Sequence, residues 1–98
     1  MSGPAGDLSG SLKRSLPIGN KRGLHARAAA KFVRTAGQFD AAVRVTFKGQ
    51  EVSGLSIMGL MMLAAGIGSS IDLICSGRQA GEAMTALAAL VEGKFGED

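Results

Sequence analysis

Two periodicities of hydrophobic and polar residues alternate along the chain and predict its secondary structure. Alternation with a period of two, typical of half-buried strands, occurs over 12–18, 42–47 and 71–76. Lys48-Gly49 then turns the chain, so that 50–53 forms a hairpin with the strand before it. The pattern therefore predicts four short strands.

Apolar residues three and four positions apart predict three helices. These helices span 26–36, 57–65 and 80–92, and Gly37, Gly66 and Gly93 end them. Ser56 stands at the N-cap position of the second helix. Residues 76–79, a serine followed three positions later by a glutamine, resemble a capping box for the third.

The order strand, helix, strand, strand, helix, strand, helix predicts an α/β (α+β) fold of two layers. Right-handed crossovers place the helices on one face of a four-stranded sheet and leave the other face to water. Residues 12–98 are long enough for one domain with one core. Residues 1–11 are small, polar and glycine-rich, so we expect a disordered tail there.

The sequence predicts a cytoplasmic protein. The longest apolar run, 55–67, is interrupted by Ser56, Gly59 and Gly66 and is shorter than the roughly 20 residues of a membrane span. The chain begins without a signal-peptide hydrophobic segment. Cys75, the single cysteine, cannot form an internal disulfide, and its strand position predicts a small core residue.

Charge is distributed unevenly along the chain, whose net charge is +3. Residues 1–39 carry seven Lys or Arg against one acid, whereas residues 40–98 carry four against seven. A basic half attracts a phosphorylated ligand, an acidic protein surface or nucleic acid, or is simply a solvated face. The chain has no Trp or Tyr on which bases could stack, which argues against nucleic acid.

Several familiar sites are incompatible with the sequence. Residues 54–59 have the glycine spacing of a P-loop, but Leu60-Met61 stands where Lys and Ser/Thr are needed. Gly66-Ile67-Gly68 lacks the third glycine of a dinucleotide fingerprint. One His and one Cys cannot complete a zinc site without carboxylates, so we expect neither metal nor cofactor.

His25 is the only histidine and precedes the first predicted helix. Alone, such a residue is usually an ordinary polar surface residue. Arg27 can donate paired hydrogen bonds to phosphoryl oxygens, and the first-turn N–H groups of Ala28 and Ala29 can donate more. Positive surroundings also favour the neutral, nucleophilic imidazole, so His25 is a candidate phosphoryl acceptor.

The segment Gly23-Leu24-His25-Ala26-Arg27 followed by Ala29-Ala30-Lys31-Phe32-Val33 resembles the phosphorylation site of the histidine phosphocarrier (HPr) family of the phosphoenolpyruvate-dependent phosphotransferase system. The resemblance extends from Lys13 to Glu97. Asn20-Lys21 and residues 93–98 are most similar to its nitrogen-related (NPr) branch, and 56–60 resemble the regulatory serine segment of HPr. The resemblance is therefore to the NPr branch or to a proteobacterial HPr.

The resemblance implies an open-faced β-sandwich and a stoichiometric carrier rather than an enzyme. It implies that phosphorylated enzyme I transfers a phosphoryl group to a ring nitrogen of His25, that Arg27 stabilises this group, and that an enzyme IIA-type histidine receives it. We expect a monomer that binds neither nucleic acid nor membrane. The alternative is a non-covalent regulatory module whose basic helix terminus binds an acidic partner or a phosphorylated ligand.

Two further features concern regulation and docking. By resemblance, Ser56 is a target of an HPr kinase/phosphorylase, in addition to its role as N-cap. The apolar residues of the second helix cannot all face inward, so some of them form an adaptable docking patch beside His25. The residues expected in this patch are Leu24, Ile57, Met58, Leu60 and Met61.

Ala28 departs from the family pattern, which usually has proline directly after the arginine. Alanine keeps the helix but adds an N–H donor and loosens the first turn. We therefore expect Ala28→Pro to change the rates of phosphoryl transfer without abolishing it. Transfer rates from donor and to acceptor that both stay unchanged in the variant would contradict this expectation.

Overall fold

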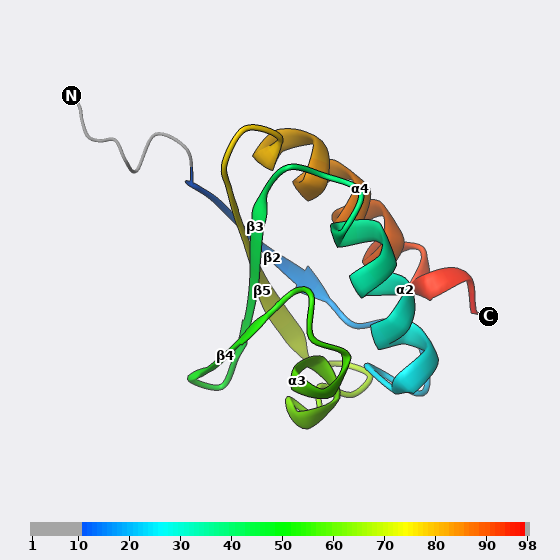
Figure 1. The fold of residues 1–98 in the computed structure, drawn as a ribbon. Helices are drawn as coiled ribbons and strands as arrows, with labels where there is room; N and C mark the ends of the chain where they lie inside the picture. Colours follow the sequence, from blue (N-terminus) through cyan, green and yellow to red (C-terminus); the bar gives the residue numbers. More distant parts are fainter. Residues whose placement is uncertain (1–10, 98) are drawn as a thin grey trace.

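The computed structural model describes residues 11–97 and shows a sheet with helices against one of its faces (Figure 1). The strands are β2 (Ser11–Pro17), β3 (Ala42–Phe47), β4 (Gln50–Ser53) and β5 (Ser70–Ser76), and all pairings in the sheet, whose order is β2-β5-β3-β4, are antiparallel. The helices are α2 (Ala26–Ala36), α3 (Ile57–Met62) and α4 (Ala80–Glu92), followed by the short 3₁₀ helix η1 (Lys94–Gly96). The predicted fold class and element order are confirmed.

Four elements, α2, β3, β4 and α4, have the bounds that the sequence predicts. β2 begins at Ser11, inside the expected tail, because the backbone of Ser11 still pairs with Ser76 of β5. The rest of the expected tail, residues 1–10, lies outside the described residues.

α3 is shorter than predicted and ends at Met62 instead of residue 65. Ala64 has a φ of 56°, in the left-handed region, which a right-handed helix cannot continue through. This turn lets the carbonyl of Ala65 accept a hydrogen bond from the N–H of Leu24 at 3.1 Å. A tertiary contact therefore ends the helix before Gly66 does.

The predicted capping box of α4 is wrong. Ser76 is the last residue of β5, and the N-cap is Gln79, whose side chain makes no capping hydrogen bond. The Gln79 Oε1 instead accepts a hydrogen bond from the backbone N–H of Asp40 at 2.7 Å. The glutamine thus holds the α2–β3 connection against the start of α4.

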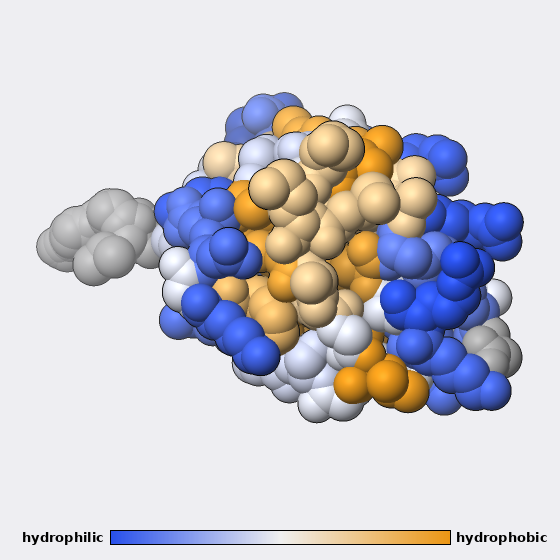
Figure 2. Space-filling view, turned by 90° about the horizontal axis from the view of Figure 1, so that it is seen from below, coloured by the Kyte–Doolittle hydropathy of each residue, from blue (hydrophilic) through white to orange (hydrophobic). Residues whose placement is uncertain are grey.

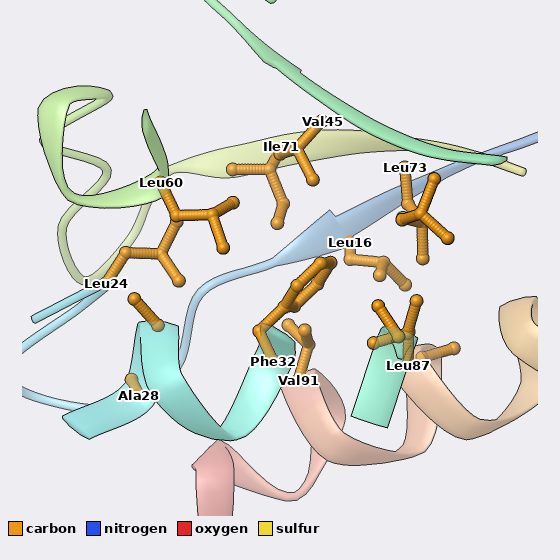
Figure 3. Close-up of a cluster of buried hydrophobic side chains, with 14 of the residues drawn as sticks. Leu16, Leu24, Ala28, Phe32, Val45, Leu60, Ile71, Leu73, Leu87 and Val91 are labelled. Carbon is orange, nitrogen blue, oxygen red and sulfur yellow. The ribbon is translucent and has the colours of Figure 1, made fainter. Parts of the chain in front are cut away.

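A single hydrophobic core fills the space between the sheet and the helices (Figure 3). Residues from β2, β3 and β5 meet Phe32 of α2 and Leu87 and Val91 of α4. Cys75 belongs to this core, as predicted, and burial raises the pKa of its thiol. Among residues 11–97, no helix is long and apolar enough to cross a membrane.

Candidate functional site

His25 is the N-cap of α2, with extended backbone angles (φ −75°, ψ 177°) and a side chain that makes no capping hydrogen bond. Its carbonyl accepts the N–H of Ala29 at 2.9 Å, which is the first bond of the helical ladder. The expectation that the Ala29 N–H binds a phosphoryl group is therefore corrected. The N–H groups of Ala26, Arg27 and Ala28 come before this bond and have no acceptor within the helix.

The loop before His25 is pinned to the segment that follows α3. Gly23 has a φ of 62°, and a Cβ on it would lie 2.4 Å from the carbonyl oxygen of Ala65. Only glycine combines this backbone conformation with so close an approach. The Leu24 hydrogen bond to Ala65 closes the same contact and fixes where α2 begins.

The C-terminal segment folds back across the start of α2. Lys94, Phe95 and Gly96 all have left-handed φ values, of 58°, 56° and 75°. For the two non-glycine residues this conformation costs about 1–2 kcal/mol each. Complete burial of the Phe95 ring offsets this cost, and Lys31 Nζ donates a hydrogen bond of 2.6 Å to the Phe95 carbonyl.

This turn brings Glu97 to the imidazole of His25. Glu97 Oε2 lies 2.5 Å from His25 Nε2, and Glu97 Oε1 accepts a hydrogen bond from Asn20 Nδ2 at 3.1 Å. Asn20 Nδ2 also donates to the carbonyl of Gly23 at 2.8 Å. The side chains of His25 and Glu97 are only 15% and 18% exposed, so the pair is largely shielded from water.

The hydrogen bond from His25 lowers the pKa of Glu97, and the Asn20 bond and the charges of His25 and Lys31 act in the same direction against partial burial. An ionised carboxylate can only accept hydrogen bonds, so His25 Nε2 carries a hydrogen. A neutral imidazole with its hydrogen on Nε2 has a lone pair on Nδ1. When the imidazole is neutral, Nδ1 is therefore the nitrogen that can act as a nucleophile.

The other residues predicted for the site occupy different environments. Arg27 is exposed on the first turn of α2, whereas Ala28 is fully buried in the core. Ser56 is confirmed as the N-cap of α3, since its Oγ accepts the N–H of Gly59 at 2.9 Å. The Leu24–Ala65 hydrogen bond places the loop that ends at His25 against the segment after α3.

The predicted docking patch needs correction at two positions. Ile57, Met58 and Met61 are exposed, but Leu24 and Leu60 are buried in the core (Figure 3). These two side chains face inward because α3 and the His25 loop cover the same end of the sheet. We define the apolar patch by its exposed members, which are Leu55, Ile57, Met58, Met61, Met62 and Ile67. Figure 2, which views the α3 end of the molecule, shows an apolar area between hydrophilic groups.

Asn20 and Glu97 are functional candidates that reasoning from the sequence missed. Glu97 is 72 positions from His25, and nothing local indicates that the two side chains meet. The apolar Phe95 in the segment Gly93-Lys94-Phe95-Gly96 was the available signal, because burial of a large apolar side chain beyond the last helix is favourable. Within residues 11–97, no group of three or more His, Cys, Asp or Glu side chains is placed to hold a metal ion.

Comparison with known proteins gives a family for this site. A family model described as "PTS HPr component phosphorylation site" matches residues 12–93. The chain belongs to the HPr family. The phosphocarrier protein HPr of Neisseria meningitidis is 55% identical over 86 residues, which cover 88% of this chain and 97% of the relative.

Relatives named for both branches of the HPr family match this chain. The phosphocarrier protein NPr of Shewanella violacea is 43% identical, with 88% of this chain and 94% of the relative covered. The crystal structure of HPr-C-His from Thermoanaerobacter tengcongensis has a TM-score of 0.85 at 41% identity, with 89% of this chain and 98% of that chain covered. This HPr-family chain therefore belongs with proteobacterial HPr or NPr, as the sequence indicated.

The lowered pKa of Glu97 predicts how acid affects the fold. Ionised Glu97 stabilises the folded state above its ordinary pKa of 4.5, and this contribution is lost as pH falls through the lowered value. We expect urea unfolding to show the largest stability difference between the protein and Glu97→Gln above that pKa, and a shrinking difference in acid. A difference that stays constant from about pH 7 to about pH 2 contradicts this assignment.

Proposed function

We propose that this chain is a stoichiometric phosphoryl carrier of the phosphotransferase system that acts in the cytoplasm. His25 accepts the phosphoryl group of phosphorylated enzyme I, which derives it from phosphoenolpyruvate, and passes it to an enzyme IIA-type histidine. The observation that carries the proposal is an imidazole with a free Nδ1 at the N-cap of α2, in a member of the HPr family. Family membership disfavours the non-covalent regulatory module.

The geometry of the N-cap supports the following transfer step. The lone pair of His25 Nδ1 attacks phosphorus, the phosphorus–nitrogen bond to the donor histidine breaks, and the electron pair of that bond returns to the donor ring. The N–H groups of Arg27 and Ala28 and the Arg27 guanidinium are available to the phosphoryl oxygens. Transfer to the acceptor is the same displacement, with His25 as the leaving group.

The apolar patch supports a role in docking. Methionine side chains adapt to differently shaped surfaces, and the patch contains three of them, Met58, Met61 and Met62. A carrier has to bind a donor and an acceptor in turn with the same surface, which an adaptable patch allows. We therefore propose that enzyme I and the enzyme IIA-type acceptor dock across α3, next to His25.

Phosphorylation of His25 is tested with phosphoenolpyruvate, Mg²⁺ and enzyme I. We expect acid-labile phosphate on the wild type and none on His25→Ala, because the chain has only one imidazole. Arg27→Ala keeps the acceptor, so it is expected to be labelled more slowly. If the wild type acquires no label under these conditions, the non-covalent alternative replaces the proposal.

We also propose that Ser56 is a regulatory phosphorylation site for an HPr kinase/phosphorylase. Its Oγ already sits at the start of α3, so a phosphate there keeps the favourable interaction with the helix terminus. The same phosphate adds about two negative charges beside Ile57 and Met58 of the apolar patch. We expect it to slow docking without unfolding the domain.

Two substitutions separate these effects. Ser56→Asp keeps an N-cap acceptor and adds a charge, so it is expected to slow transfer from enzyme I while the fold stays stable. Ser56→Ala removes the cap without adding charge, so it is expected to lose about 1 kcal/mol of stability with little change in transfer rate. Equal transfer rates for Ser56→Asp and the wild type would show that charge at this position does not regulate docking.

A further inference from the structure

We propose that Glu97, oriented by Asn20, is a positioning residue that determines which ring nitrogen of His25 receives the phosphoryl group. The proposal deepens the carrier function and rests on it. Glu97 holds the hydrogen of the imidazole on Nε2, turns the ring to present Nδ1, and prevents a phosphoryl group from reaching Nε2.

The orientation of Glu97 is fixed from two sides. One oxygen contacts His25 Nε2, and the other accepts the amide of Asn20, which is fully buried. Asn20 is fixed in turn by its bond to the carbonyl of Gly23. An exposed carboxylate would sample many rotamers, whereas this one is held by a buried donor.

The buried side chain of Asn20 acts as a hydrogen-bond donor to Gly23 and Glu97. Its Nδ2 makes both hydrogen bonds, while its Oδ1 has no hydrogen-bond partner within the described part of the chain. An unpaired buried acceptor lowers the stability of the fold. If this position served stability alone, an apolar side chain would suit it better. The arrangement makes sense if the gain lies in holding the His25 loop and Glu97 together.

The backbone conformation of η1 also supports the proposal. Lys94 and Phe95 adopt left-handed conformations that non-glycine residues rarely adopt, and the buried Phe95 ring and the Lys31 bond hold them there. This strained turn places Glu97, the residue after Gly96, against the imidazole of His25. Strain that is kept in place by its surroundings, at the edge of a reactive group, is typical of functional sites.

Chemistry explains why a carrier needs this control. A free imidazole can be phosphorylated on either nitrogen, and in a histidine side chain Nε2 is the one farther from the backbone. A phosphoryl group on Nε2 would lie away from the N–H groups of Arg27 and Ala28 at the start of α2. With the hydrogen already on Nε2, Nδ1 attacks without any proton leaving the ring, and the Glu97 bond persists after transfer.

The groups around the carboxylate agree with this role. Asn20 and His25 from the loop before α2, and Lys31 from α2, are the donors and charges that act on Glu97, and each of them favours its ionised form. The ionised form is the one that repels phosphoryl oxygens from Nε2.

The proposal is tested by chemical phosphorylation with phosphoramidate, which needs no partner protein. A ring nitrogen attacks phosphorus, the bond from phosphorus to nitrogen in the reagent breaks, and ammonia leaves. The two phosphohistidine isomers are told apart by ³¹P and ¹⁵N resonances. We expect Nδ1-phosphohistidine alone in the wild type, and a mixture that includes the Nε2 isomer in Glu97→Ala and Asn20→Ala.

Glu92→Ala is the matched control, because it removes one carboxylate that pairs with Arg14 instead of His25. It is expected to give the wild-type isomer. Glu97→Gln keeps the size of the side chain, but its amide has only one oxygen to accept hydrogen bonds from Asn20 and His25. It is therefore expected to give an intermediate mixture. The same isomer ratio in the wild type and Glu97→Ala, or a mixture in the wild type, overturns the proposal.

Transfer from enzyme I gives a second measurement. We expect Glu97→Ala to lower kcat for His25 phosphorylation by about 10- to 100-fold, by analogy with the loss of the partner that orients a metal-binding histidine. KM for the carrier should change little, since Glu97 is not part of the apolar patch. An unchanged kcat overturns the positioning role. A wild type that enzyme I cannot phosphorylate contradicts the carrier function, while the phosphoramidate result still reports on Glu97.

Discussion

The apolar face of one antiparallel sheet has to be covered, and the rest of the molecule depends on how the helices cover it. α2 and α4 lie along this face (Figure 1) and enclose a core that includes Phe32 and Leu87 (Figure 3). Once α2 is packed there, its first turn is fixed at the edge of the sheet layer, with His25 as its N-cap. The position of His25 is therefore a consequence of hydrophobic burial, and the helix terminus supplies N–H groups without an acceptor in the helix at the same point.

The site itself is assembled from three separate parts of the chain. The loop before α2 provides Asn20 and His25, the turn after α3 provides the Ala65 carbonyl that holds this loop, and the C-terminal turn provides Glu97. Positive charge alone does not describe this site, since a carboxylate lies against the imidazole. The two ring nitrogens thus have different environments: Nε2 contacts an anion, and in the neutral imidazole the lone pair is on Nδ1.

The sequence predicted most of the fold, because local periodicity and caps determine α2, β3, β4 and α4. It failed where a tertiary contact overrides a local signal: α3 stops at Met62 because the chain turns to meet Leu24, and Gln79 bonds to Asp40 instead of capping α4. The same limit applies to the site. His25 and the Ser56 cap are visible as local motifs, whereas Glu97 reaches His25 only through the buried ring of Phe95.

The left-handed turn at Lys94–Gly96 changes what the end of this chain can tolerate. Residues beyond a last helix usually fray and accept substitutions or insertions freely. Here one inserted or deleted residue between Phe95 and Glu97 would leave the ring in the core and move the carboxylate off the imidazole. The number of residues between Phe95 and Glu97 is thus as strict a requirement as the identity of these residues.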